Sequence, residues 1–130
     1  MFDLPQGWPR RIALLVVSAF FSFAGITHFT NTAFFLAIVP PYLPAHLELV
    51  YTSGVFEVMG GVGVLLPAWR KAAGYGLIAL LVAVYPANIH MALNPDLFPD
   101  MTATALYVRL PLQFVMGWLV WWATRAESIS

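Results

Sequence analysis

The sequence predicts an all-α membrane protein, a bundle of four transmembrane helices. Two observations favour this fold class. Hydrophobic residues make up 61% of the 130 residues and charged residues only 9%, and the apolar residues gather into four stretches of about 20 residues each. A water-soluble domain of this size would leave much of that apolar surface exposed. We therefore expect a single integral membrane domain, residues 1–130, with lipid as its solvent.

The four predicted spans cover residues 11–29, 48–66, 72–92 and 103–124. Each is long enough to cross the apolar core of a bilayer, and helix is required there because lipid cannot satisfy backbone polar groups. The Arg10-Arg11 pair before the first span is similar to the start of a signal peptide. The apolar run that follows is long, however, and we expect it to be a retained span.

The first connector, residues 31–47, is apolar, but Pro40, Pro41 and Pro44 break it and it is too short to cross the bilayer. We expect a short element that lies in the outer interface or folds back over the mouth of the bundle. Two alternatives stay open for its role. It acts either as a lid or as a simple interfacial loop.

Basic residues flank the predicted spans on one side of the membrane: Arg10, Arg11, Arg70, Lys71 and Arg125. The first and third connectors carry His46, Asp96 and Asp100 instead. The positive-inside rule therefore places both termini in the cytoplasm. The formal net charge of zero gives no electrostatic reason to expect nucleic-acid binding. Since the chain has no cysteine, disulfides and thiol redox chemistry are excluded.

Ionisable residues inside spans are costly, and each of them is a functional candidate. Glu57 lies near the middle of the second span, and Arg109 lies about two turns from the outer end of the fourth. His28 and Asn88 lie near the outer ends of the first and third spans. Each span thus has a polar residue at about the same depth, in the outer half of the membrane. We predict a polar pocket there, with Glu57 and Arg109 within reach of each other.

Helical spacing extends this predicted pocket. Gln113 shares a face with Arg109 at i,i+4, and Tyr85 shares one with Asn88 at i,i+3. Such groups can bind the carbonyl oxygens of a quinone head group, and a carboxylate or an imidazole can relay its proton. No catalytic residue is assigned, and no metal is expected because the histidines lack the helical spacing of a metal motif. The candidate ligand-binding residues are Glu57, Arg109, Asn88, Gln113, His28 and Tyr85.

A structural interpretation of the same residues stays open. Glu57 and Arg109 would form a buried ion pair that fixes the helix register. Asn88 and Gln113 would then serve only to hydrogen-bond neighbouring helices to one another.

Several short segments resemble the DoxX-like family of small bacterial membrane proteins: AGITHF (24–29), IVPPYLP (38–44), SGVFEVMGGVGVLLP (53–67), YPANIHMAL (85–93) and RLPLQF (109–114). The resemblance covers all four spans. It implies a multi-pass, four-helix protein of the bacterial inner (cytoplasmic) membrane. The family is named for a subunit of a thiosulfate:quinone oxidoreductase, which implies a link to membrane redox systems. It carries over no catalytic assignment to His28, Glu57, Asn88, Arg109 or Gln113.

Three functions follow as alternatives from the predicted pocket. The first is the binding of a quinone-like or other lipid-soluble ligand, as an accessory or subunit of a membrane redox system. The second is a non-catalytic membrane scaffold whose polar cluster is structural, and the third is a small proton-coupled transporter. Whether the chain is an enzyme stays open; the enzymatic form would be an oxidoreductase subunit that relies on a partner or a bound quinone. No intrinsic cofactor is expected, and the candidate partners are membrane lipid, a soluble or membrane redox protein and a second copy of the chain.

Overall fold

The computed structural model describes residues 7–99 and 101–125, and the regular secondary structure of this part of the chain consists of helices alone, without strands. The all-α prediction is therefore confirmed. Asp100, counted above among the acidic residues of the third connector, lies outside the described residues. The elements in chain order are α1 (Trp8–Thr30), α2 (Thr32–Ile38), α3 (His46–Gly63), α4 (Arg70–Leu93), the 3-10 helix η1 (Pro95–Leu97) and α5 (Ala103–Thr124).

Three of the described helices, α1, α4 and α5, are long and apolar enough to cross a membrane. The structure is thus compatible with a multi-pass membrane protein. The predicted span at residues 48–66 forms α3, but this helix has only 18 residues and is not among the three candidate spans. Two glutamates, Glu48 and Glu57, and several glycines dilute its apolar character. The predicted four-span membrane bundle is therefore not confirmed.

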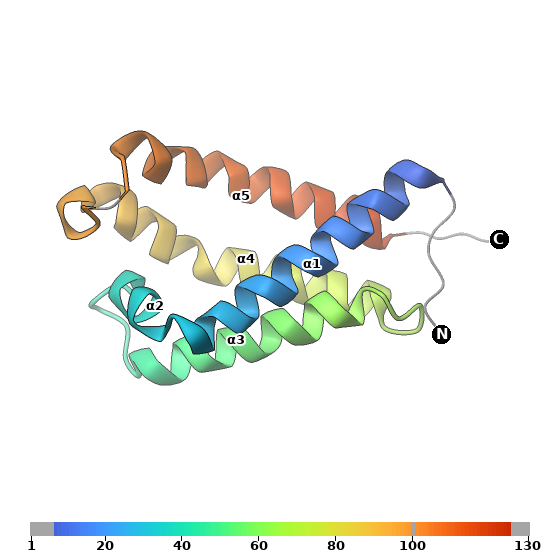
Figure 1. The fold of residues 1–130 in the computed structure, drawn as a ribbon, viewed down its shortest axis with the longest axis horizontal. Helices are drawn as coiled ribbons and strands as arrows, with labels where there is room; N and C mark the ends of the chain where they lie inside the picture. Colours follow the sequence, from blue (N-terminus) through green and yellow to red (C-terminus); the bar gives the residue numbers. More distant parts are fainter. Residues whose placement is uncertain (1–6, 100, 126–130) are drawn as a thin grey trace.

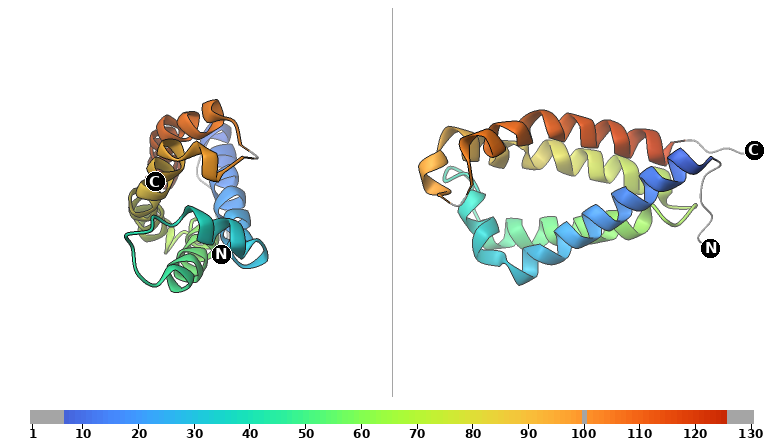
Figure 2. Two further views of the ribbon diagram at one scale, coloured as in Figure 1. Left: turned by 90° about the vertical axis from the view of Figure 1, so that its left-hand side faces the viewer. Right: turned by 45° about the horizontal axis from the view of Figure 1, so that its top comes forward.

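The long helices form two pairs, with α1 packed mainly on α3 and α4 mainly on α5. The pairs lie together where α1 begins and α5 ends, and they separate toward the opposite end (Figures 1 and 2). At that opposite end α2 lies between them and contacts α1, α3 and α4. The first connector therefore does fold back over the bundle, as one form of the prediction had it. Its role as a lid stays a prediction.

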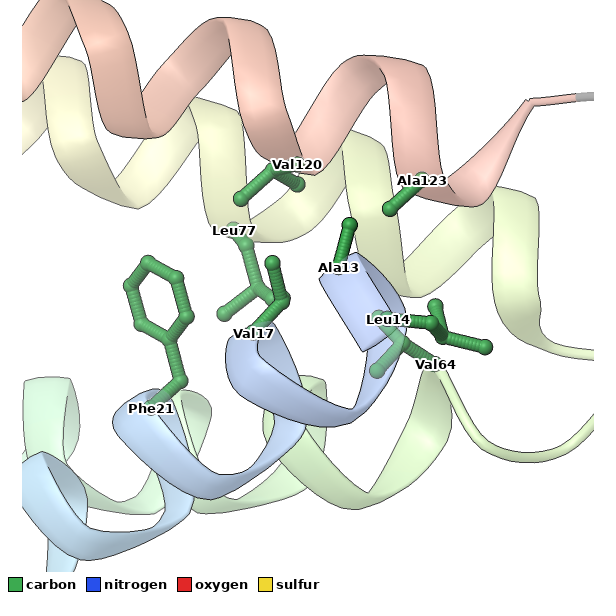
Figure 3. Close-up of a cluster of buried hydrophobic side chains, with 8 residues drawn as sticks. All are labelled: Ala13, Leu14, Val17, Phe21, Val64, Leu77, Val120 and Ala123. Carbon is green, nitrogen blue, oxygen red and sulfur yellow. The ribbon is translucent and has the colours of Figure 1, made fainter. Parts of the chain in front are cut away.

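Two separate apolar clusters hold the helix pairs together. The first lies near the start of α1 and joins α1, α4 and α5 to the residue that follows α3 (Figure 3); its buried members are Ala13, Leu14, Val17, Phe21, Val64, Leu77, Val120 and Ala123. The second, at the α2 end, consists of Ile38, Met91, Phe98 and Leu106. Burial of these side chains away from solvent or lipid fixes both ends of the molecule and leaves the region between them less tightly packed.

Two glycines bring α1 and α3 close together. A Cβ atom added to Gly25 would lie 2.7 Å from the carbonyl oxygen of Gly54, and one added to Gly54 would lie 2.7 Å from the Cβ of His28. No side chain larger than hydrogen fits at either position without a shift of the helices. Small residues at such contacts allow close helix packing. The α1–α3 spacing therefore depends on this glycine pair.

Arg70 explains why α3 ends three residues earlier than predicted. Its Nε donates a hydrogen bond to the Val64 carbonyl at 2.6 Å, and one of its terminal nitrogens donates to the Leu65 carbonyl at 3.2 Å. Both carbonyls belong to the turn that follows α3, where buried backbone groups need partners outside a helix. The buried guanidinium thus holds the chain in a turn after Gly63 instead of a continued helix.

Candidate ligand-binding cavity

A cavity of about 300 Å³ lies between the two helix pairs, at the end covered by α2. Its walls are mostly apolar, with residues such as Phe20, Leu80 and Val84, and α2 contributes Phe35 and Ile38. The volume is at the lower limit of ordinary small-molecule sites, which begin at about 300 Å³. The polar side chains of the lining are His28, Ser53, Glu57, Asn88, Arg109 and Gln113.

The first polar group of the cavity joins α1 to α3. Nε2 of His28 lies 3.4 Å from Oε2 of Glu57, and both side chains are at least nine-tenths buried. The other ring nitrogen, Nδ1, lies 2.8 Å from the carbonyl oxygen of Ala24. A carbonyl only accepts hydrogen bonds, so Nδ1 carries a proton and donates it to Ala24. The ring is thereby held with Nε2 directed at Glu57.

This geometry places one exchangeable proton between His28 and Glu57. With Nδ1 protonated, Nε2 either bears a second proton and faces an ionised carboxylate, or it has no proton and accepts a hydrogen bond from a neutral carboxyl group. In both forms a single proton makes the contact favourable. A neutral imidazole beside an ionised carboxylate would set two acceptors against each other. Proton exchange between this pair and a ligand stays a prediction.

An aromatic ring from α2 covers His28. The Phe35 ring stacks on the imidazole with 3.9 Å between centroids and 19° between planes. Thr32, at the start of α2, donates from its hydroxyl to the His28 carbonyl at 2.9 Å. The position of α2 is thus tied to His28, the residue that contacts Glu57. Sequence reasoning did not find Phe35, because only the backward fold of α2 brings it to His28.

The second polar group lies on α4 and α5. Nε of Arg109 donates to Oδ1 of Asn88 at 3.3 Å, and Nδ2 of Asn88 donates to Oε1 of Gln113. Nε2 of Gln113 in turn donates to the Leu81 carbonyl at 2.9 Å. This chain of hydrogen bonds fixes the orientation of both amides and holds Arg109 at the cavity.

The predicted approach of Glu57 to Arg109 is not what the structure shows. Among the described residues, the Glu57 carboxyl group contacts His28, and Arg109 hydrogen-bonds Asn88. The prediction rested on depth in the membrane, and depth does not fix the rotation of a helix about its axis. The Gly25–Gly54 contact turns Glu57 toward α1. The two residues line the same cavity from different helix pairs.

Five of the six predicted site residues lie at this cavity, and Tyr85 is the exception. Its ring packs against Phe114 of α5, edge to face, with 5.5 Å between centroids. The i,i+3 spacing correctly put Tyr85 near the turn of Asn88, but the ring points to the α4–α5 contact. Ligand binding by the other five residues stays a prediction.

The fold and the site together define a class: a small helical protein, apolar enough to cross a membrane several times, with a partly polar cavity between two helix pairs. The chain belongs to a family described as a domain of unknown function (DUF8561), whose model matches residues 17–127. Comparison with curated proteins finds no match, nor does comparison with solved structures.

The family assignment corrects the predicted membership of the DoxX-like family. The segments behind that resemblance are short and rich in glycine, proline and aliphatic residues. The bilayer favours such compositions in many unrelated helices, which weakens short matches of this kind. The family therefore gives no support to the redox link that the resemblance implied.

Proposed function

We propose that this protein is an integral membrane protein that binds a lipid-soluble, quinone-like ligand in the cavity between its helix pairs. The observation that carries the proposal is the composition of that cavity. Mostly apolar walls hold two separate polar groups, the His28–Glu57 pair and the Arg109–Asn88–Gln113 chain. Ligand sites commonly combine apolar walls with a few convergent polar groups in this way.

Arg109 supplies the donor for the ligand. Among the described residues its one hydrogen bond runs from Nε to Asn88, so its terminal amino groups remain able to donate to a carbonyl oxygen. A guanidinium is always charged and makes strong, directional hydrogen bonds with oxygen acceptors. Because Asn88 and Gln113 hold the side chain in place, little rotational freedom would be lost when a ligand binds.

The His28–Glu57 pair supplies proton exchange on the other helix pair. A quinone head group is neutral and has a carbonyl oxygen on each side of its ring. One oxygen would accept a hydrogen bond from Arg109. The other would take up a proton from the pair on reduction and return it on oxidation. Electrons would come from a partner protein. In this form the chain acts as an accessory or subunit of a membrane redox system and contributes no intrinsic cofactor.

The proposal includes a membrane arrangement with α3 as a fourth, short span and both termini in the cytoplasm. Its support is the distribution of charge. Five of the six basic residues lie at the end of the bundle where α1 and α4 begin and α5 ends: Arg10, Arg11, Arg70, Lys71 and Arg125. Such clustering is typical of the cytoplasmic side. We infer residence in a cytoplasmic membrane, which is the inner membrane in a bacterium with two.

A second candidate function is a membrane scaffold in which the polar groups only hold helices together. The chain from Arg109 to the Leu81 carbonyl favours it, since these hydrogen bonds link α4 to α5 without a ligand. Hydrogen bonds between helices stabilise membrane bundles by about 1 kcal/mol each.

The test is quinone binding by the purified protein. The protein would be extracted in mild detergent from quinone-containing membranes, and co-purifying small molecules identified by mass spectrometry. Decylubiquinone would then be titrated into the quinone-free protein, into Arg109→Gln and into Tyr85→Phe. We expect binding to the wild type and to Tyr85→Phe, and at least tenfold weaker binding to a helical, monodisperse Arg109→Gln protein. Absence of binding to the wild type would favour the scaffold.

A further inference from the structure

The structure has a second cavity, of about 310 Å³, on the outer side of the α4–α5 pair at the basic end of the bundle. We propose that this groove binds an anionic phospholipid, with the phosphate of the head group between Lys71 and Arg125 and the start of an acyl chain along the groove. Its lining residues are Lys71, Tyr75, Ile78, Trp121, Thr124 and Arg125.

The order of side chains along the groove matches the order of chemistry in a lipid. On α4, Lys71, Tyr75 and Ile78 are spaced i, i+4 and i+7 and share one face. They run from a cation at the end of the helix through an amphipathic ring to an aliphatic side chain. On the α5 side, Arg125 directly follows the helix and Trp121 lies one turn before it, so they repeat the first two steps. A lipid presents a charged head group, then an interfacial region and then an acyl chain, in the same order as these side chains.

Arg125 is already held in a position that suits a phosphate. Its guanidinium carbon lies 3.6 Å from the centroid of the Trp121 ring, a cation–π contact. A guanidinium that lies over a ring can still donate from its N–H groups to phosphate oxygens. Lys71 lines the same groove from the facing helix. A phosphodiester would therefore meet positive charge from both helices.

The groove faces outward because α4 and α5 are in close contact beneath it. A Cβ atom added to Gly74 would overlap the side chain of Thr124, so the two backbones approach each other there. Tyr75 is 63% exposed and Trp121 is 45% exposed. In a membrane these rings would lie in the headgroup region, where tyrosine and tryptophan are enriched. Basic sites between helices on the cytoplasmic side are suited to anionic head groups.

This inference rests on the membrane placement proposed above, but not on quinone binding. The groove takes Lys71, Tyr75 and Ile78 from α4, whereas the internal cavity takes α4 residues from Leu80 to Asn88. The two sites share no residue. A protein that binds no quinone can therefore still bind the lipid, and each proposal can fail alone.

The experiment is a lipid titration of the delipidated, full-length protein in a nonionic detergent, followed by native mass spectrometry. Dioleoylphosphatidylglycerol is the anionic lipid, dioleoylphosphatidylcholine the zwitterionic control and sodium phosphate the competitor. We expect phosphatidylglycerol to bind at least tenfold more tightly than phosphatidylcholine. Lys71→Gln and Arg125→Gln should each weaken it about fivefold, or about 1 kcal/mol per basic residue.

Matched variants separate the groove from the general charge of this end. Arg11→Gln removes one positive charge at the same end but outside the groove, and it should leave the affinity within twofold of the wild type. The double variant Lys71→Arg, Arg125→Lys keeps both charges and should retain binding. An unchanged affinity for phosphatidylglycerol in both the Lys71→Gln and the Arg125→Gln variants would overturn the proposal. Equal binding of both lipids, or full displacement by millimolar phosphate, would overturn it as well.

Discussion

His28 and Glu57 meet beside the glycine contact of α1 and α3, with 3.4 Å between Nε2 and Oε2. Gly25 and Gly54, the glycines of that contact, each precede one member of the pair by three residues. The close approach that sets the helix spacing therefore also sets the distance between imidazole and carboxyl group. Helix packing and site geometry have the same cause here.

The His28–Glu57 pair should show strong energetic coupling. His28→Ala and Glu57→Ala each leave a buried polar partner unsatisfied, so the double variant should lose less free energy of unfolding than the sum of the single losses. We expect a difference of about 1–3 kcal/mol. Unfolding in mixed detergent and SDS measures it. The combination of His46→Ala with Glu57→Ala should be additive, because the hydrogen bond of His46 within the described part of the chain is a local one to the Leu43 carbonyl. Additivity in the His28–Glu57 cycle would contradict the assigned contact.

Gly54→Ala should destabilise the α1–α3 pair. The new methyl group would meet the Cβ of His28 at 2.7 Å, and such overpacking costs about 1–3 kcal/mol. Gly76→Ala is the matched control, since a Cβ at that position would have no described atom within 4 Å apart from its chain neighbours and the backbone of its own helix. Alanine there should be neutral or slightly stabilising because it favours helix more than glycine does. Equal thermal stability of the two variants would count against the glycine contact.

Asn88→Leu should destabilise the α4–α5 pair by about 1–3 kcal/mol. The substitution removes the acceptor of Arg109 and the donor to Gln113 at once, and both half-buried side chains would lose these partners. Ser53→Ala is a suitable comparison. It removes only a local, exposed bond to the Leu49 carbonyl and should change the free energy of unfolding by less than about 0.5 kcal/mol.

Truncation of Phe35 should uncover His28. The ring stacks on the imidazole at 3.9 Å, so Phe35→Ala removes its cover on the α2 side. Diethylpyrocarbonate modification of His28, followed by peptide mass spectrometry, should become several-fold faster. Phe23→Ala truncates a phenylalanine that is 70% exposed and should leave the rate unchanged. An unchanged rate in Phe35→Ala would show that α2 does not limit access to His28.

Arg70→Met should destabilise the turn between α3 and α4. Two hydrogen bonds from the guanidinium to the Val64 and Leu65 carbonyls are lost, and bonds that involve a charged group contribute about 1.5–3 kcal/mol. Lys71→Met, at the next position, provides the control because Lys71 is exposed. Its melting temperature should stay close to that of the wild type, whereas that of Arg70→Met should fall by several degrees.

The long helices could be predicted from the sequence because apolar runs between proline-rich connectors set their limits. The predicted segment 103–124 coincides with α5, and the others differ from their helices by a few residues. The end of α3 was missed because the turn after Gly63 is held by the side chain of Arg70, which lies beyond the predicted span. The helix α2 was not predicted as a helix because its seven residues are too few to show a helical repeat of apolar residues.

The members of the site could be predicted, but their partners could not. A charged or polar side chain is costly to place inside an apolar, membrane-spanning segment, and this cost alone singles out Glu57, Arg109 and Asn88. Which of them touch depends on helix rotation, and rotation depends on contacts such as Gly25 against Gly54. The residues that line the cavity could therefore be predicted from the sequence, whereas the contact of Glu57 with His28 could be seen only in the structure.

The short helix α2 has a kinetic consequence. It has seven residues, and a helix of that length is not stable by itself. It holds its place through Thr32 and through the packing of Phe34, Phe35 and Ile38 on the second apolar cluster. These contacts can be lost locally while the long helices remain packed. We therefore expect α2 to set the residence time of any molecule that the cavity binds. This residence time could change in evolution without a change in the stability of the bundle.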